Sequence, residues 1–386
     1  MYAIAIGAGD EAVFAIKRAQ SKGLKVLAFD GDPGAEGLRY ADESFVTDIR
    51  DPGNIFEVID KKEIPSDEMF VLPVPIGRYL ISTGAFNDHY GLTGPGLQTT
   101  EICTDKWLFH QTLAKDDLRN IRCVLLKKGQ IPVYPDKYPY IIKPRYGAGS
   151  REVLHISSSK DLYKISSQIP FDEDFIIEDA VDGCEYGIDG MVFNGEFRLI
   201  LTRKKLLTPP PYRQCVGYIS LKKNDDLNTV LCGFMTRLIS AISLKDGIVH
   251  ADIIMHGDDP FVIEMSPRPS GHRLHNLFTP MVTGVDMISD YIDHLMNKRP
   301  EDHVTERDEV YIIRYFDMES EIKRIPDRES LIKKYSLSEY ECNLTPGEKT
   351  KIKDGHSLMG RGFFILKGSS EKEVVDKAAA VLDEYV

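Results

Sequence analysis

Two carboxylates stand in apolar surroundings on either side of a short turn, in the stretch VHADIIMHGDDPFVIEMSPRPSG from Val249 to Gly271. The intervening residues, HGDDP, are typical of a turn, and the flanking segments are short, apolar and β-prone, which predicts a hairpin. A turn centred on Asp258 places Asp252 opposite Glu264, with Cβ atoms roughly 5 Å apart. Two opposed carboxylates repel each other unless a cation lies between them, and Mg²⁺ prefers oxygen ligands. The hairpin therefore predicts a divalent-metal site, whereas a turn shifted by one residue would leave an ordinary acidic face.

A second stretch, IIKPRYGAGSREV, joins two cationic side chains to a glycine loop. Lys143 and Arg145 end a predicted strand, and Gly147-Ala148-Gly149-Ser150 follows. Residues without side chains let backbone N–H groups approach anionic oxygens, and Ser150 adds a hydroxyl donor. The sequence has no Walker-type P-loop pattern. Alone, the segment is an ordinary turn with basic neighbours, but together with the acid pair it indicates a phosphate-binding loop.

A third motif favours a different chemistry. GAGDEA, from Gly7 to Ala12, follows the first predicted strand, and Asp30 ends the second strand. That is the spacing, about twenty residues, of a ribose-binding acid in a dinucleotide site, so the pattern alone suggests an NAD-dependent oxidoreductase. A tight strand-to-helix turn needs glycines whether or not it binds a pyrophosphate, and Asp10 would repel phosphate. The oxidoreductase is therefore the weaker alternative.

Length and composition limit the function further. A chain of 386 residues is too long for one ordinary domain, and a net charge of −12 argues against general binding to nucleic acid or to anionic membranes. Six scattered cysteines without a CxxC pair favour a reducing compartment. The N-terminal residues resemble no basic leader, and no apolar run reaches membrane-spanning length. We expect a cytoplasmic protein without nucleic-acid or membrane partners.

The elements that must position these residues form three stretches. Strand and helix patterns alternate over residues 1–95, which predicts a parallel sheet. Residues 96–300 contain helices, one of them expected over 99–116, and runs of strands with an Asn194-Gly195 hairpin turn. Residues 301–386 are charged and strand-rich before a closing helix.

Four segments, in this order, resemble the ATP-grasp superfamily: TDKWLFHQTL, YIIKPRYGAGSREV, FIIEDAVDGCEYGIDG and HADIIMHGDDPFVIEMSPRPSG. GRGFFILKGSSEKEVVDKAAAVL is similar to the closing region of carboxylate–amine ligases. The resemblance implies an α/β protein with a Rossmann-like pre-ATP-grasp domain over 1–95. A two-lobed α+β ATP-grasp domain would follow over 96–300, with its mobile lobe at 110–180, and a small C-terminal β-rich subdomain over 301–386 would pack on it.

The resemblance also implies roles for individual residues. Lysines and the glycine loop would face the phosphates of ATP, one glutamate and two backbone positions the adenine edge, and a second glutamate the ribose. The implied ATP-binding residues are Lys106, Lys143, Gly147, Ala148, Gly149, Ser150, Glu178, Asp179, Val181 and Glu185. Plain surface roles are the alternatives for Lys106, Glu178 and Glu185.

Asp252 and Glu264 match the Mg²⁺ ligands of the family, which holds one or two ions and also accepts Mn²⁺. Ser266 stands where the family usually has asparagine, and a hydroxyl is a poorer ligand, so a second metal site is expected to be weak. Arg268 takes the position of an arginine that steadies the transferred phosphoryl group, and with Lys143 it is the implied catalytic pair. A surface ion pair is the alternative for Arg268.

The implied activity is the ATP-dependent joining of a carboxylic acid or amino acid to an amine through an acyl phosphate, with release of ADP and phosphate. Such chemistry requires positioning and charge neutralisation rather than a protein nucleophile. Candidate substrate residues are Arg203, Lys204, Arg213, Ser270, Gly271 and His272, although His272 is equally a structural histidine. Homodimers are common among similar enzymes. A bicarbonate-activating carboxylase and a non-catalytic ATP-binding protein are further alternatives.

Overall fold

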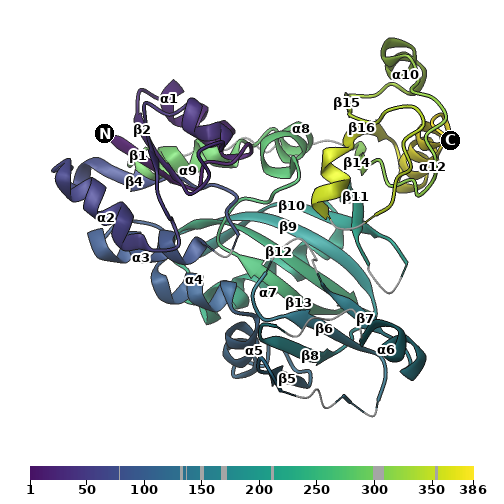
Figure 1. Cartoon of the computed structure of the whole chain (residues 1–386), viewed down its shortest axis with the longest axis horizontal. Helices are drawn as coiled ribbons and strands as arrows, with labels where there is room; N and C mark the ends of the chain where they lie inside the picture. Colours follow the sequence, from purple (N-terminus) through teal and green to yellow (C-terminus); the bar gives the residue numbers. More distant parts are fainter. Residues whose placement is uncertain are drawn as a thin grey trace.

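The computed structural model describes residues 1–77, 79–130, 134–135, 137–147, 152–166, 172–209, 213–298, 308–352 and 355–386. Its strands form a four-stranded parallel sheet, a large antiparallel sheet and a second four-stranded sheet. In Figure 1 the N-terminal part and the C-terminal part lie at opposite sides of the view, with strands β9, β10 and β12 of the central sheet between them. The predicted α/β class, with a parallel sheet first and antiparallel sheets after it, is confirmed.

The N-terminal sheet has the strand order β3-β2-β1-β4, and all its strands are parallel. The strands are β1 Tyr2–Ile6, β2 Lys25–Asp30, β3 Glu43–Val46 and β4 Met69–Val71. The helices around it are α1 Ala12–Ser21, α2 Pro52–Lys61, α3 Leu80–Tyr90 and the short 3-10 segments η1 Glu36–Arg39 and η2 Ser66–Glu68. The middle strand β1 is buried on both faces, which explains its unbroken apolar run.

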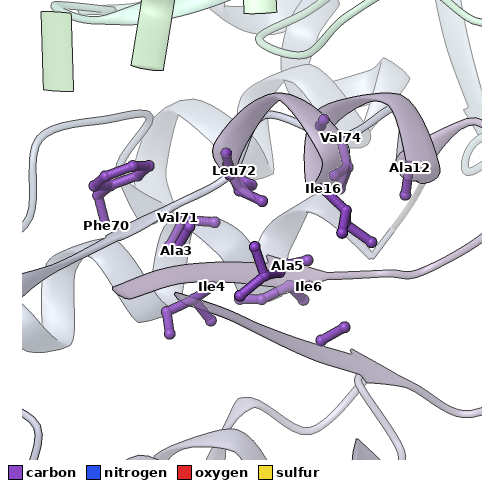
Figure 2. Packing of buried hydrophobic residues seen from close by; sticks show 14 of the residues in the cluster. Ala3, Ile4, Ala5, Ile6, Ala12, Ile16, Phe70, Val71, Leu72 and Val74 are labelled. Carbon is purple, nitrogen blue, oxygen red and sulfur yellow. The ribbon is translucent and has the colours of Figure 1, made fainter. Parts of the chain in front are cut away.

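Helix α9, Met287–Leu295, returns late in the chain to complete this N-terminal core. Figure 2 shows the core itself, where Ile16 of α1 and the side chains of Leu72 and Val74 gather with those of β1. Apolar side chains of α9 belong to the same buried cluster, and Figure 1 shows the helix among the first elements of the chain. Ion pairs from Arg18 to Asp286, at 2.6 Å, and from Lys22 to Asp293, at 2.7 Å, add to this packing.

The central sheet has the order β13-β12-β9-β10-β11-β14-β16-β15. Its strands are β9 Cys184–Phe193, β10 Glu196–Leu207, β11 Cys215–Ser220, β12 Gly247–His256, β13 Asp259–Ser266, β14 Val310–Tyr315, β15 Glu339–Cys342 and β16 Gly362–Gly368. Helices α7 Asp226–Ala241 and α8 Thr279–Thr283 and the π-helical turn η3 Leu274–Phe278 accompany it. The predicted Asn194-Gly195 turn joins β9 to β10 with both residues at positive φ, as a two-residue hairpin requires.

The third sheet, with the order β5-β8-β6-β7, is antiparallel. Its strands are β5 Cys123–Leu126, β6 Tyr140–Pro144, β7 Leu154–Ile156 and β8 Phe175–Asp179, with helix α6 Ser159–Ser166 beside it. The single helix expected over 99–116 is wrong, because α4 Leu97–Thr104 ends and α5 Lys106–Ala114 begins at Asp105. The Asp105 carboxylate accepts hydrogen bonds from the backbone N–H groups of Trp107 and Leu108 and so caps α5.

The C-terminal strands β14, β16 and β15 extend the central sheet rather than forming a sheet of their own. Helices α10 Arg328–Tyr335, α11 Gly355–Gly360 and α12 Glu371–Asp383 complete this part. The side chain of Ser370 accepts a hydrogen bond from the Glu373 N–H and so caps the start of α12. Within the described residues, every helix is too short or too polar to cross a bilayer.

Candidate active site

The hairpin of β12 and β13 brings the two predicted metal acids face to face. Asp252 pairs with Glu264, as predicted, but the turn consists of Gly257 and Asp258 and is not centred on Asp258. A β-bulge next to Asp252 adds one residue, Ile263, to β13 and restores the expected pairing. Ile263 and Glu264, although adjacent in sequence, both line the same cleft, which regular alternation would not allow. The bulge therefore turns Glu264 toward Asp252.

This cleft lies between the third sheet and the β12–β13 end of the central sheet. Every described member of the predicted ATP-binding set lines it: Lys106, Lys143, Gly147, Glu178, Asp179, Val181 and Glu185. Ala148, Gly149 and Ser150 lie outside the described residues. One part of the cleft is apolar, with Ile141, Val153, Ile254 and Phe261, and suits a flat base. The part of the lining that contains the lysines and the acid pair is charged. The cleft therefore has an apolar region and a charged region.

The two lysines come from different elements and meet at the charged region. Lys106 begins α5, and its ammonium donates to the carbonyl of Gly147 at 2.7 Å. Lys143 is the last residue but one of β6, and its ammonium lies 2.5 Å from the Glu178 carboxylate. Burial lowers the pKa of Lys106 below its ordinary value, although Glu264 acts in the opposite direction. Two cations beside an acid pair form a site that can neutralise a triphosphate.

The acid pair has the unoccupied oxygens that a metal requires. Lys205 of β10 lies 2.7 Å from Oδ2 of Asp252, whereas Oδ1 is buried and has no hydrogen-bond partner among the described residues. Glu264 likewise has no ion pair or hydrogen bond within the described part of the chain. No group of three metal-binding side chains occurs among the described residues. Two facing carboxylates would still fit Mg²⁺, which would take its remaining ligands from phosphates and water.

A fully buried ion pair lies beneath the acid pair. Arg203 of β10 forms a double contact with Asp189 of β9, and both are 0% exposed. Asp189 also accepts from Thr279 at 2.8 Å and lies 3.3 Å from Nδ1 of His250. Burial opposes ionisation of Asp189, but Arg203 and His250 outweigh it and lower the pKa. His250 of β12 pairs with Ser266 of β13, so this network is connected to the two strands that carry Asp252 and Glu264.

The fold places the three cationic side chains among the substrate candidates in three different surroundings. Arg203 is committed to the buried pair with Asp189. Lys204, the next residue, points to the other face of β10 and pairs with Glu371 at 2.6 Å. Arg213 lines the nucleotide-type cleft and pairs with Glu185 at 2.9 Å.

The segment from Arg268 to His272 lies between the acid pair and the N-terminal sheet. Arg268 shares a small pocket with Lys106, Glu264 and Ser266, and within the described residues its guanidinium has no carboxylate partner. Burial lowers the pKa of Arg268. One nitrogen of this half-buried guanidinium donates to the Pro269 carbonyl at 2.7 Å, and a guanidinium without a counter-ion beside a phosphate-type site can bind an anion.

The rest of this segment is fixed by hydrogen bonds. The buried Ser270 hydroxyl donates to Asp189 at 3.2 Å, and the carbonyl of His272 accepts from Tyr315. Burial, then Arg268, lowers the pKa of His272 to about 4, so its ring is neutral at pH 7. A Cβ at Gly271 would stand 3.0 Å from the Glu11 carboxylate, which is a tight contact.

Two residues of the candidate site were not predicted from the sequence. Lys205 lies between Asp252 and Glu185, and these acids outweigh its burial and raise its pKa. The strand pattern contained a signal for Lys205. Arg203 and Lys205 alternate with Lys204 along one strand, so they share one face of it, and this is the face of the acid pair. The other is Arg119, a buried arginine without any sequence motif.

The N-terminal glycine loop opens into a separate cavity that has an acidic lining. Asp30 accepts from the backbone N–H of Ala8 at 2.7 Å and from that of Asp32 at 2.9 Å, so its carboxylate holds the loop in place. Asp10 and Asp48 are among the other lining residues. Such a lining repels a pyrophosphate, which disfavours the dinucleotide interpretation of this loop.

Comparison with known proteins agrees with this geometry. Residues 136–275 match the sequence profile of the ATP-grasp domain. A D-alanine–D-alanine ligase of Campylobacter jejuni subsp. doylei is 22% identical over 209 residues, which cover 52% of this chain and 60% of that protein. An L-arginine-specific L-amino acid ligase of Bacillus subtilis is 24% identical over 208 residues, 50% of each chain. The chain thus spans about half the length of the curated relatives it matches.

Solved structures extend the likeness to the whole chain. An L-amino acid ligase from Bacillus licheniformis superposes with a TM-score of 0.77, 17% identity and coverage of 100% of this chain and 98% of that one. An N5-carboxyaminoimidazole synthetase from Staphylococcus aureus, solved with ADP, has a TM-score of 0.72, 13% identity and coverage of 99% and 96%. At these identities the likeness shows a shared fold. The sequence match therefore identifies an ATP-grasp domain over residues 136–275, and the whole chain shares the fold of these structures.

Proposed function

We propose that this protein is an ATP-dependent, ADP-forming ligase that joins a carboxylic acid to an amine. One observation carries the proposal: the opposed acids Asp252 and Glu264 face a cleft that also holds Lys106 and Lys143. Cations that neutralise phosphates, beside acids that fit Mg²⁺, are the equipment of phosphoryl transfer. Both curated relatives named above are amino-acid ligases, which supports an amino acid as the acid component.

In the first step, an oxygen of the substrate carboxylate attacks the γ-phosphorus of ATP, the bond to the β-phosphate breaks, and ADP leaves. Lys106 and Lys143 would hold the phosphates in line, and Mg²⁺ bound by Asp252 and Glu264 would supply further charge neutralisation. In the second step, the amine nitrogen attacks the acyl carbon, loses a proton and displaces phosphate. Arg268, with no carboxylate partner among the described residues, is suited to bind the phosphate of the acyl phosphate through both steps.

The acid and the amine would bind beside the Arg268 to His272 segment, on the side of the N-terminal sheet. Ser270, Gly271 and His272 remain candidate substrate-binding residues. Arg213 fits the nucleotide region better, because it pairs with Glu185 in the cleft. All six cysteines are free thiols, which supports a reducing compartment such as the cytoplasm.

A screen of amino-acid pairs for Mg-ATP-dependent phosphate release tests the proposal. Glu264→Gln is the blank, and Glu57→Gln on the exposed face of α2 is the matched control that leaves activity intact. We expect release with at least one pair, none from Glu264→Gln, and a product that contains both amino acids. Turnover of Glu264→Gln at the wild-type rate would refute the metal assignment, and release with bicarbonate alone would indicate a carboxylase.

A further inference from the structure

Arg119 lies between α5 and β5 and is only 2% exposed. All three nitrogens of its guanidinium are engaged. One donates to Glu178 of β8 at 2.7 Å, one to Nδ1 of His110 in α5 at 3.0 Å, and Nε to the carbonyl of Val262 in β13 at 3.2 Å. The side chain therefore connects the third sheet with the strand that carries the metal acid.

The contact with Glu178 places Arg119 next to the phosphate lysine. Arg119 occupies one oxygen of the Glu178 carboxylate, and Lys143 lies 2.5 Å from the other. Burial opposes ionisation of Glu178, but Arg119 and Lys143 outweigh it and lower its pKa to about 2. The carboxylate is thus ionised at pH 7, and the three groups together carry one net positive charge.

That net charge depends on Arg119. Without the guanidinium, Lys143 and Glu178 would form a neutral pair, and among the described residues Lys143 alone would remain in an ion pair with this buried carboxylate. A lysine that already neutralises a carboxylate attracts a phosphate less. The carboxylate and the phosphate would then share one cation and repel each other. With Arg119 present, the guanidinium neutralises the negative charge of Glu178, and the charge of Lys143 remains for a bound phosphate.

We propose that Arg119 is a positioning residue for phosphate binding: it neutralises Glu178 and thereby leaves the charge of Lys143 for the phosphates of the nucleotide. This inference rests on the proposed function, because it takes the cleft to be the nucleotide site. His110 is compatible with it. A guanidinium can only donate, so Nδ1 of His110 accepts and the ring is neutral, in keeping with a pKa lowered by burial and by Arg119.

A purely structural role gives a different expectation. Arg119 also lies over the ring of Phe261, 5.1 Å from its centroid, and holds the carbonyl of Val262, so its loss disturbs the walls of the cleft. Disturbed walls would weaken binding of the base and of the phosphates alike. Loss of the charge on Lys143 would weaken binding of the phosphates alone.

The test compares the affinities for ADP and adenosine by calorimetry in one Mg²⁺ buffer, and the ratio of the two is the readout. Arg119→Met is expected to lower the ratio roughly tenfold or more, the value of one charge-assisted contact. Arg119→Lys, which keeps the charge, should retain most of the ratio. In Arg119→Met/Glu178→Gln the carboxylate is gone as well, so the ratio should recover.

The single variant Glu178→Gln supplies a second measurement if Arg119→Met fails to fold. It removes the negative charge while Arg119 stays, so its ratio should exceed that of the wild type. Equal loss of ADP and adenosine binding in Arg119→Met would overturn the inference, and so would a double variant without recovery or an unchanged ratio in Glu178→Gln. If the wild type binds neither ligand, the proposed function itself fails, and the inference fails with it.

Discussion

Acidification is expected to destabilise the protein through His275, a fully buried residue in the π-helical turn η3. Its Nδ1 donates to the carbonyl of Ser270, in the segment that carries Arg268. Its Nε2 is buried and has no hydrogen-bond partner among the described residues. A proton added to Nε2 would therefore introduce a charge without an acceptor, which is costly in a buried site.

The magnitude follows from the pKa. Burial is the largest cause that lowers the pKa of His275 from the ordinary 6.5 to about 4. The unfolded chain thus takes up the proton first as the pH falls, so the stabilisation is complete above pH 6.5 and is lost between pH 6.5 and about 4. A difference of this size corresponds to about 3 kcal/mol of unfolding free energy.

Urea unfolding of the wild type and of His275→Asn, measured from pH 7.5 to pH 4.5, isolates this contribution. The Asn amide can donate to the Ser270 carbonyl in place of Nδ1, but it does not titrate. Other titrating groups affect both proteins equally, so the wild type should lose about 2.5 kcal/mol more than the variant over this range. Parallel curves for the two proteins would refute the reasoning, because they would mean that His275 is protonated as easily in the folded protein as in the unfolded one.

Three further predictions concern single residues. Asp189→Asn should lower the unfolding free energy by about 3–5 kcal/mol in urea titrations, because it leaves the buried Arg203 without its counter-ion. Glu264→Gln should remove Mg²⁺-dependent ADP binding in calorimetry while thermal stability stays the same or rises slightly, since Glu264 has no partner to lose among the described residues; a large loss of stability would contradict its placement. Gly183→Ala should cost about 3 kcal/mol or more in thermal unfolding, because the added Cβ would stand 2.1 Å from the Met255 carbonyl and the backbone has φ +152°; a variant with the stability of the wild type would show that this backbone can relax.

The sequence predicted those features that depend on local pattern. Apolar flanks and turn residues were enough to place Asp252 and Glu264 on the two facing strands of a hairpin, and four ordered motifs were enough to indicate the family. The position of the turn was wrong by half a residue and the bulge was missed, because Gly257 and Ile263 follow no pattern that fixes a register before tertiary packing does. The break between α4 and α5 was readable, since Asp105 followed by a helical run is a capping signal.

The site residues that were missed depend on contacts between distant segments. Strand alternation separates Lys204 from Arg203 and Lys205, yet only the fold shows which face meets the acids. Arg119 gains its importance from Glu178 and Val262, which lie far along the chain. Local propensity does not carry such information, because these contacts form when whole sheets pack.

The late return of helix α9 to the first sheet has a consequence for biosynthesis. The last strand of that sheet ends at Val71, but the helix that closes its core ends at Leu295. At about 5–20 residues per second, a ribosome would need roughly 10 to 45 s to supply the missing helix. During that interval the nascent N-terminal sheet exposes an apolar surface, so we expect it to recruit chaperones until Met287 and its neighbours emerge.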